Sequence, residues 1–273
     1  MMRKVSTLAM TFPQADLRPM SGRLELAVAE AAACPGARPE RVSRVLTVIY
    51  ETIASLPVTP DLIRCLPSGT REWLVQRAAL HFRSDITWFE ATCTGCGKPY
   101  DLTLDLSEAA KISPPMQQPY VEVETSLGSR SFEVINGEHE EVFAKGDVGV
   151  DPRRAMAGVC GLAEQAAEEA NQFNDHDLDL IDEALEAVSP DIADQTKTVC
   201  PSCGVKTTAR IDPLLFAFPK EQDILQDTHL IAYHYGWQHD QILSLSARHR
   251  EFFAAMIAQD RRTAGRAGAR RLA

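Results

Sequence analysis

The chain has 273 residues, of which 45% are hydrophobic and 24% are charged. This is typical of a globular protein that buries its core in one large domain or two smaller ones. The formal net charge of −10 argues against broad binding along a nucleic-acid backbone, which needs clustered Lys and Arg, but leaves a local basic patch open. No stretch reaches the ~18 apolar residues expected of a membrane span.

The seven cysteines indicate the compartment. Four lie in two Cys-x-x-Cys motifs, and Cys34, Cys65 and Cys160 are single. This pattern is typical of thiols that serve a metal in a reducing compartment, rather than of disulfides. Residues 5–12 are too short and too polar to be the core of an export signal. We therefore expect a cytoplasmic protein.

The first 84 residues are expected to form an arm and a helical region. Residues 1–20 hold two prolines and no sustained period, so we expect a flexible arm that becomes ordered only against a partner. Residues 21–84 form the predicted N-terminal helical region. Its helices are expected to begin at the N-cap Ser21, at about Pro39 with an apolar face that continues to Ile53, and at an N-cap formed by Ser68 or Thr70.

The periodicity changes after residue 84. Residues 85–92 are rich in β-branched and aromatic side chains, and residues 100–106 alternate between apolar and polar ones, which predicts two strands. Between them lies the first cysteine motif, Cys93-Thr94-Gly95-Cys96-Gly97. We call this tight cysteine turn a knuckle. With its two strands it makes one half of a predicted zinc ribbon.

Residues 108–194 are predicted to be an inserted α/β subdomain. A β-hairpin is expected over residues 119–135 with its turn at Leu127-Gly128-Ser129, followed by a second turn at Asn136-Gly137. Helices are expected from residue 152 to about 171 and from about 178 to 188. Between Gly161 and Asp194 there are eleven Asp or Glu and no Lys or Arg. This predicts a solvated acidic face, with a docking surface for a basic partner as the alternative.

The second knuckle, Cys200-Pro201-Ser202-Cys203-Gly204, repeats the plan of the first between two further predicted strands. A Cys-x-x-Cys turn can place two thiolates about 2.3 Å from one zinc ion, and two such pairs complete a tetrahedral site. The glycine after each motif accepts the positive φ of a sharp turn. We therefore predict one structural zinc ion with four ligands, Cys93, Cys96, Cys200 and Cys203.

The distance between the two knuckles in the sequence is unusual. Residues 97–199, which are 103 residues, separate them, whereas a simple zinc ribbon has roughly 15–20. We expect a split ribbon, formed by residues 85–107 and 195–213, that carries the inserted subdomain. The predicted fold class is α+β, mainly helical, with this split four-cysteine zinc-ribbon-like β element.

Residues 214–260 are predicted to form the C-terminal helices. The first ends at Tyr235-Gly236-Trp237, with Gly236 as its C-cap, and Ser246 can cap the last. The tight turns between them leave a helix-turn-helix open. Residues 261–273 contain five arginines and no acidic residue, and we expect a disordered basic tail.

The motifs predict a protein without enzymatic activity. Four thiolates fill the zinc tetrahedron and leave no open position for a substrate. The run Glu138-His139-Glu140-Glu141 lacks the second histidine of a His-Glu-x-x-His site, and there is no Gly-rich phosphate loop and no Gly-x-Ser-x-Gly elbow. A dithiol oxidoreductase motif would open a helix, whereas both motifs here lie between predicted strands. The C-terminal histidines are assigned surface or capping roles: His229, His234, His239 and His249.

The order of motifs resembles the baseplate hub assembly chaperone family of T-even-type phages, whose relatives occur in prophages and in phage-tail-like contractile injection systems. The resemblance covers about residues 56–258, loosely across the insertion, and departs at both ends of the chain. The motifs that carry it are Leu66-Pro67-x-Gly69-x-Arg71, the first knuckle with its Asp-Leu-rich strand, Cys200-Pro201-x-Cys203-Gly204, Tyr235-Gly236-Trp237, Ile242-Leu243-x-Leu245 and Arg250-x-Phe252.

The resemblance implies a non-enzymatic protein of baseplate or tail assembly. Its expected partners are baseplate or tail-hub proteins, with no membrane and no small-molecule substrate. It would act in the cytoplasm of a bacterial or phage-infected cell, or be incorporated into the assembled particle. The alternative is a nucleic-acid-binding regulator built from a zinc ribbon, a helix-turn-helix and a basic tail. Phe252, Phe253, Met256 and Ile257 dominate its recognition helix, which argues against that alternative.

Overall fold

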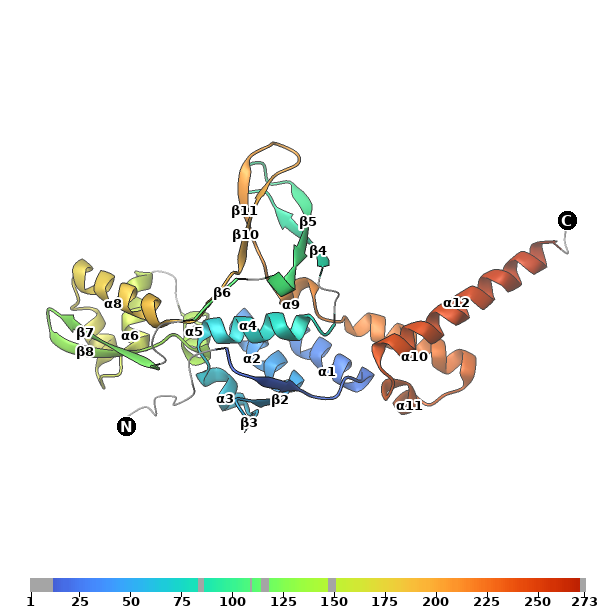
Figure 1. The fold of residues 1–273 in the computed structure, drawn as a ribbon, viewed down its shortest axis with the longest axis horizontal. Coiled ribbons are helices and arrows are strands. Elements are labelled where there is room, and N and C mark those ends of the chain that lie inside the picture. Colours follow the sequence, from blue (N-terminus) through green and yellow to red (C-terminus); the bar gives the residue numbers. More distant parts are fainter. Residues whose placement is uncertain (1–11, 83–85, 109, 114–117, 147–150, 271–273) are drawn as a thin grey trace.

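The computed structural model describes residues 12–82, 86–108, 110–113, 118–146 and 151–270, with the backbone alone at 86–87 and 263–270. This part of the chain is α+β, and its sheets are small and antiparallel. A central helical body carries three projections (Figure 1). They are a pair of β-hairpins, an inserted α/β lobe and a C-terminal helical lobe. No helix in the described ranges is both long and apolar enough to cross a membrane.

The central body packs helices on a small three-stranded sheet of order β1-β2-β3. One large core of buried side chains fills it, and Val45, Ile49 and Leu74 are among those with no exposed surface. The Ser21 hydroxyl accepts a hydrogen bond from the Leu24 amide at 3.3 Å, so Ser21 is the predicted N-cap. The elements of the body are β1 (Ala15–Leu17), α1 (Gly22–Ala33), α2 (Arg38–Ile49), β2 (Tyr50–Ile53), β3 (Leu56–Pro57), α3 (Pro60–Cys65) and α4 (Ser68–Ala79).

The expected flexible arm is wrong for residues 12–20, while residues 1–11 lie outside the described part. Strand β1 pairs with β2 in antiparallel register, and the Phe12 ring lies 5.5 Å from that of Trp73. The arm is ordered by its own chain because β2 offers it a strand edge. That strand exists because the second helix ends at Ile49 rather than near Ile53: Tyr50 and its β-branched neighbours favour extended backbone.

The predicted cap of the third helix is also wrong. Pro67 is the residue before α4, and no side chain caps it. Ser68 and Thr70 lie inside the helix instead. The Pro67 ring presets a backbone conformation suited to the helix start without a capping hydroxyl.

The two β-hairpins stand side by side on one face of the body (Figure 1). Each is a separate two-stranded sheet. Their bases join the main core through buried side chains that include Phe89 and Ala209. The Phe89 ring stacks on Phe216 with a centroid distance of 5.2 Å. The elements are β4 (Ile86–Thr92), β5 (Pro99–Asp105), η1 (Leu106–Glu108), β10 (Gln195–Val199), β11 (Lys206–Arg210) and α9 (Pro213–Phe216).

The inserted lobe has a small core of its own, in which side chains of β7 and β8 pack against α6, α7 and α8. The chain enters and leaves it through the paired strands β6 and β9. Its elements are β6 (Lys111–Ile112), β7 (Tyr120–Thr125), β8 (Gly128–Glu133), α5 (Gly137–Phe143), α6 (Pro152–Cys160), α7 (Ala166–Ala170), α8 (Asp175–Val188) and β9 (Asp191–Ile192).

Three local predictions for the insertion need correction. The hairpin turn lies at Ser126-Leu127, one residue earlier than expected. The helix predicted from 152 to 171 is two helices, because the chain leaves α6 at Gly161 in an extended conformation. Asn136-Gly137 begins a helix instead of making a turn, since the Asn136 side chain accepts hydrogen bonds from the backbone amides of Glu138 and His139.

A buried arginine joins the inserted lobe to the body. Arg71 on α4 is fully buried and donates to the Ser43 hydroxyl at 3.1 Å and to the Pro39 carbonyl at 2.8 Å. Its Nε lies 3.2 Å from the Glu140 carboxylate on α5. A Cβ on Gly137 would lie 1.7 Å from Arg71 Nη1. Only a glycine lets α5 approach this guanidinium so closely.

The C-terminal lobe consists of α10 (Glu221–Tyr235), α11 (His239–Leu243) and α12 (Ala247–Arg270) around a small apolar core. Gly236 has φ +68° at the end of α10, in the left-handed conformation expected of a glycine C-cap. A buried ion pair between Glu25 and Arg250 ties the lobe to α1.

The predicted disordered tail is wrong for residues 261–270, which continue α12, and residues 271–273 lie outside the description. Ala and Arg are good helix formers. Extending a helix that already exists avoids the nucleation cost that would keep such a segment unfolded alone.

Candidate metal centre

The two knuckles have the same backbone geometry. In each, the amide of the first cysteine donates to the carbonyl five residues later, at 3.0 Å, and the glycine amide donates back to that cysteine's carbonyl, at 2.9 Å. Gly97 and Gly204 have φ values of +70° and +72°. This left-handed conformation is strained for any residue with a Cβ, which is why each turn ends in glycine.

The structure brings the four predicted cysteines together. Their Sγ atoms all lie within 4.8 Å of one another. Cys93 Sγ is 3.7 Å from Cys203 Sγ, and Cys96 Sγ is 3.8 Å from Cys200 Sγ. These distances are too long for disulfides, whose sulfurs are about 2.05 Å apart. A tetrahedron with metal–sulfur bonds of about 2.3 Å has edges of about 3.8 Å, so the cluster is compatible with a four-coordinate metal site.

The cluster has an inner and an outer half. Cys93 and Cys200 are 1% exposed, whereas Cys96 and Cys203 are exposed. The two outer thiols would give an ion a route from solvent, and the two inner ones would hold it against the protein.

The thiols are poised unequally for ionisation. Amide groups of Cys96 and Gly95 lower the pKa of Cys93 to about 6, and the Gly95 amide lies 3.3 Å from Cys93 Sγ. At Cys203 the Val205 amide favours the thiolate, but desolvation and the three other thiols raise the pKa to about 12. Four thiolates at these distances repel one another, and a bound cation removes that repulsion.

Few other contacts join the two knuckles. The hydroxyls of Thr94 and Thr207 lie 3.0 Å apart, and a Cβ on Gly95 would lie 3.4 Å from the Val205 side chain. Tyr100 packs against the inner cysteines in a small cluster. No strand of one hairpin is hydrogen-bonded to a strand of the other in the described sheets, so the cysteines are the main link between the hairpin tips.

The acidic run around His139 does not build a second metal site. Among the described residues the four cysteines are the only group of three or more ligand side chains close enough to share an ion. Glu141 instead lies 3.1 Å from Arg64, and Glu140 contacts Arg71. These carboxylates help to attach α5 to the body.

His234 accepts a hydrogen bond from Arg261 at 3.1 Å.

A buried thiol lies beside His139, which sequence reasoning missed. Cys160 Sγ is 3.7 Å from His139 Nδ1, and His139 Nε2 is 3.5 Å from Glu133. These are the residue types of a cysteine–histidine–carboxylate triad. All three side chains are buried, so a substrate would not reach them. Their distant positions in the sequence offered no signal for this contact.

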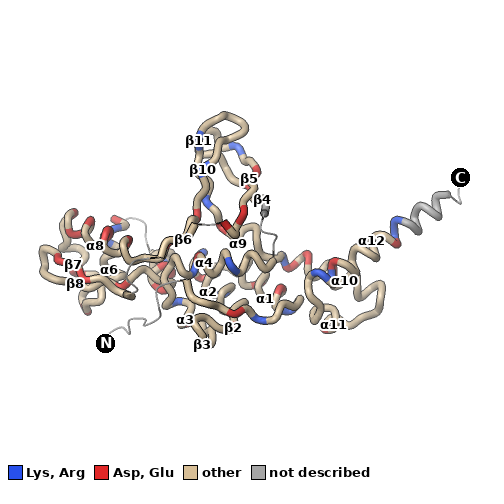
Figure 2. The backbone as a smooth tube through the Cα atoms, viewed as in Figure 1, with Lys and Arg blue, Asp and Glu red and all other residues tan. Residues whose placement is uncertain are grey.

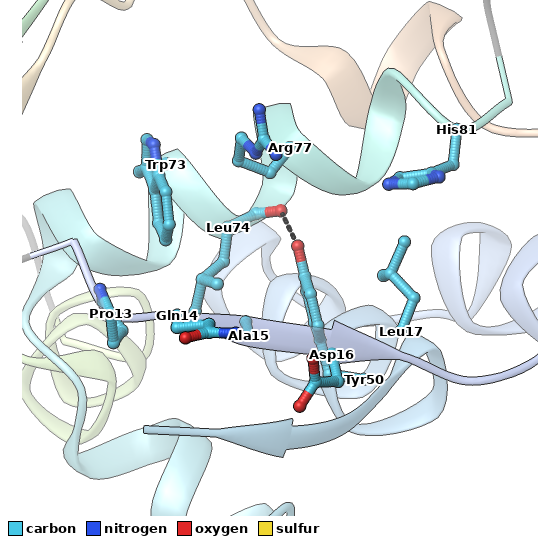
Figure 3. A pocket seen from close by; sticks show the side chains of 10 residues that line it. All are labelled: Pro13, Gln14, Ala15, Asp16, Leu17, Tyr50, Trp73, Leu74, Arg77 and His81. Carbon is cyan, nitrogen blue, oxygen red and sulfur yellow. Dashed lines mark hydrogen bonds between the residues drawn. The ribbon is translucent and has the colours of Figure 1, made fainter. Parts of the chain in front are cut away.

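A pocket of about 450 Å³ lies between β1 and α4 (Figure 3). Trp73, Arg77 and His81 line one side of it, and the Tyr50 hydroxyl donates to the Leu74 carbonyl at 2.8 Å. Burial, and then the charge of Arg77, lower the pKa of His81. The ten described residues that line the pocket include no Ser, Thr or Cys.

The fold and the site define an α+β protein with a four-cysteine centre compatible with a metal ion. Comparison of the chain with protein-family models, with curated proteins and with solved structures finds no match.

Proposed function

We propose that this protein is a zinc-stapled, non-enzymatic assembly or adaptor protein for the baseplate or tail hub of a phage or phage-like contractile injection system. The observation that carries the proposal is the fit of the four Sγ atoms, with paired distances of 3.7 and 3.8 Å, to a closed tetrahedral site. A site with four protein ligands has no position for substrate, so the ion would be structural.

Zinc fits this ligand set better than the common oxygen-binding ions. Thiolates are soft ligands, and a tetrahedral set of four sulfurs is typical of zinc or iron. Calcium and magnesium prefer six or more oxygen ligands. Cys93, Cys96, Cys200 and Cys203 would hold the ion, which would supply a cross-link and charge neutralisation.

The position of the centre suits a staple. The first hairpin leads into the inserted lobe, and the second returns from that lobe and leads to α9 and the C-terminal lobe. A cross-link between the hairpins closes a loop of about one hundred residues. By analogy with a disulfide, such a closure stabilises the folded state by ~4–5 kcal/mol. An adaptor needs surfaces held in fixed positions. A cross-link between the hairpins would fix the positions of two of them, the inserted lobe and the C-terminal lobe.

The biological setting is supported by the order of sequence motifs alone. The cysteine knuckles, the Tyr235-Gly236-Trp237 block and the Arg250-x-Phe252 helix together resemble the baseplate hub assembly chaperones. Partners would be baseplate or tail-hub proteins in the bacterial cytoplasm or in the assembled particle. The exposed acidic helices and the C-terminal lobe offer surfaces for them.

The metal part of the proposal is tested by elemental analysis of the purified chain. We expect one zinc per chain in the wild type and in the control Cys34→Ser, whose thiol lies outside the cluster. Cys93→Ser and Cys200→Ser should each lose the ion on dialysis against a chelator. One cysteine variant that kept full zinc and normal folding would contradict the shared site, and iron in place of zinc would correct the metal.

The assembly part is tested separately. The tagged chain would be expressed with its whole gene cluster and purified under mild conditions. We expect a stoichiometric baseplate or tail-hub protein to co-purify. A protein that remains alone in such lysates would contradict the assembly role without touching the zinc site.

A nucleic-acid-binding regulator is the second candidate, and one observation favours it. The arginine-rich segment up to Arg270 is part of helix α12, a regular support for positive charge. Against it, two large apolar side chains, Phe252 and Met256, are exposed on that helix. A DNA mobility shift that weakens with salt and disappears on deletion of residues 261–273 would support this candidate, and no binding at low salt would exclude it.

A further inference from the structure

A slot lies between the bases of the two β-hairpins, with β5 on one side and β10 on the other. Its volume of about 350 Å³ is within the range of ligand pockets, about 300–1,000 Å³. Ala110 and Ala193, whose backbones are hydrogen-bonded next to the β6–β9 pair, close one end of it. We call it the hairpin slot.

Both walls of the hairpin slot are open strand edges. In an antiparallel pair every second residue directs its amide and carbonyl away from the partner strand. The hydrogen bond from the first cysteine of each knuckle to the carbonyl five residues later sets this alternation. It directs the backbone of Thr103 away from β4 and that of Gln195 away from β11, and both residues line the slot. Each hairpin is a two-stranded sheet in the described part of the chain, so these edges have no third strand.

The slot also contains a buried acceptor without a donor. Gln76 on α4 lines the slot and is 3% exposed. Its Nε2 donates to the Ala193 carbonyl at 3.2 Å, whereas its Oε1 accepts no hydrogen bond from the described residues. Because a buried acceptor without a donor is unfavourable, an amide that entered the slot would supply the missing partner.

The side chains of the first hairpin differ between its two faces. Toward the body they are apolar, and Leu104, Leu106 and Ile211 line the slot there. The outer face is aromatic and acidic, because alternate positions of β4 and β5 place four exposed side chains on it: Trp88, Glu90, Asp101 and Thr103.

The charge around the slot favours a basic ligand beside β5. Its described lining contains the carboxylates of Asp105 and Glu108 and no Lys, Arg or His. Hydrogen bonds from the Ser107 hydroxyl and amide lower the pKa of Asp105, so this group is ionised at neutral pH. The second hairpin is basic instead (Figure 2), with exposed side chains at Lys197, Lys206 and Arg210.

We propose that the hairpin slot binds an extended segment of a partner protein, in which basic and apolar residues alternate, as an added strand on the open edge of β5. In such β-augmentation the main chain supplies hydrogen bonds and alternate side chains supply specificity. The apolar side chains of the segment face Leu104 and Ile211. The basic ones lie beside Asp101 and Asp105, and the ring of Trp88 offers them a cation–π contact. This inference goes beyond the assembly role and needs neither the phage setting nor the metal.

Binding of labelled peptides to the full chain, followed by fluorescence anisotropy, tests the proposal. The probe is a peptide about nine residues long in which lysine alternates with valine. We expect a dissociation constant on the order of 10 μM. One control peptide has the same composition with its valines in a single block, and a second has glutamate in place of lysine. Both should bind at least about fivefold more weakly. The block peptide controls for general attraction to a chain of net charge −10.

Proline substitutions locate the edge that the peptide uses. Thr103→Pro removes an amide that faces the slot and none that bonds to β4, so it should weaken binding by about three- to tenfold. Thr208→Pro is the matched control, because it removes an amide of β11 that faces away from β10, and it should leave binding unchanged.

A charge reversal at an exposed position gives a second test that does not depend on tolerance of proline. Asp101→Lys should weaken binding of the lysine peptide by about threefold or more and strengthen binding of the glutamate peptide. Asp182→Lys on α8 makes the same change of charge at an exposed position away from the slot, and it should have no effect.

Hydrogen exchange with the lysine peptide bound should slow over residues 99–105 and stay unchanged over residues 128–133 of β8. The proposal is overturned by equal binding of the alternating and block peptides, by equal losses in the two proline variants, or by no binding up to about 500 μM. Each of these results would leave the zinc and assembly tests unaffected.

Discussion

The central body and the cysteine hairpins are held together in different ways. The body is built around a core of 22 buried residues, which the bases of the hairpins join through Phe89 and Ala209, and burial of apolar side chains is sufficient to fold a unit of this kind. Around the knuckles, the buried cluster of described residues consists of Cys93, Tyr100 and Cys200, and Trp88 on the first hairpin is 68% exposed. Two-stranded hairpins with so little core are marginal alone. Packing of apolar side chains therefore accounts for the body, whereas the hairpin tips have little buried surface to hold them, and we propose that an ion bound by the four cysteines does so.

Loss of a cysteine ligand should separate the two regions most clearly. Structural zinc sites contribute about 10–16 kcal/mol on binding, so Cys200→Ser should release the hairpin tips. We expect faster amide hydrogen exchange over residues 86–105 and 195–210, while α2 and α4 keep their protection. Cys34→Ser serves as the control. Equal loss of protection in α2 and α4 would mean that the ion holds the whole fold and that the body is not independent.

A cavity in the body should have the opposite effect to loss of a cysteine: it should lower the stability of the body and leave the metal centre intact. Leu74 has no exposed surface, and Leu74→Ala should lower the free energy of unfolding by about 2–5 kcal/mol. The metal content should not change, because the cysteines do not contact this side chain. Urea denaturation with zinc analysis measures both. Leu215→Ala, at an exposed position, should cost little, and a comparable cost there would contradict the assignment of stability to the core.

A substitution where the inserted lobe joins the body should have a smaller effect on stability. Gly137→Ala places a methyl group 1.7 Å from the buried Arg71 guanidinium. Such overpacking costs about 1–3 kcal/mol. We expect limited proteolysis to cut the chain near α5 sooner than in the wild type. Gly146→Ala is the matched control, since the nearest atom to its added methyl group would be 3.6 Å away. Identical cleavage of both variants would contradict the role of the Gly137–Arg71 contact in joining the lobe to the body.

The inserted lobe should also respond to acid. Burial opposes ionisation of Asp177, but hydrogen bonds from Ser126 and Asn174 lower its pKa. The Ser126 amide lies 2.7 Å from its carboxylate. A carboxyl group with a lowered folded-state pKa adds stability above its unfolded pKa of about 3.9, and this stability is lost as the pH falls through the folded value.

Substitution of this carboxylate tests the acid response. Asp177→Asn should cost about 1–3 kcal/mol at neutral pH and should flatten the loss of stability below about pH 4. Urea unfolding from pH 3 to pH 7, followed by hydrogen exchange in α8, measures the change. Asp182→Asn, at an exposed position on the same helix, is the control. If Asp177→Asn lost stability with acid as the wild type does, the Asp177 carboxylate would not be the cause of the acid response.

Local signals in the sequence determined several parts of this protein. Ser21 and Gly236 mark the start and the end of helices because capping depends on a side chain or a backbone angle at one residue. The α+β class follows from the change between helical and alternating periods. The glycine-terminated cysteine turns also act within five residues, so each knuckle is recognisable alone.

Only the tertiary structure decided which distant segments meet. Convergence of Cys93 and Cys96 with Cys200 and Cys203 depends on how the intervening insertion returns to its starting point through β6 and β9. The order of residues 12–20, the end of α2 and the contact of Cys160 with His139 depend equally on neighbours far along the chain. Such contacts arise from burial and pairing between segments, and a pattern confined to one segment does not carry that information.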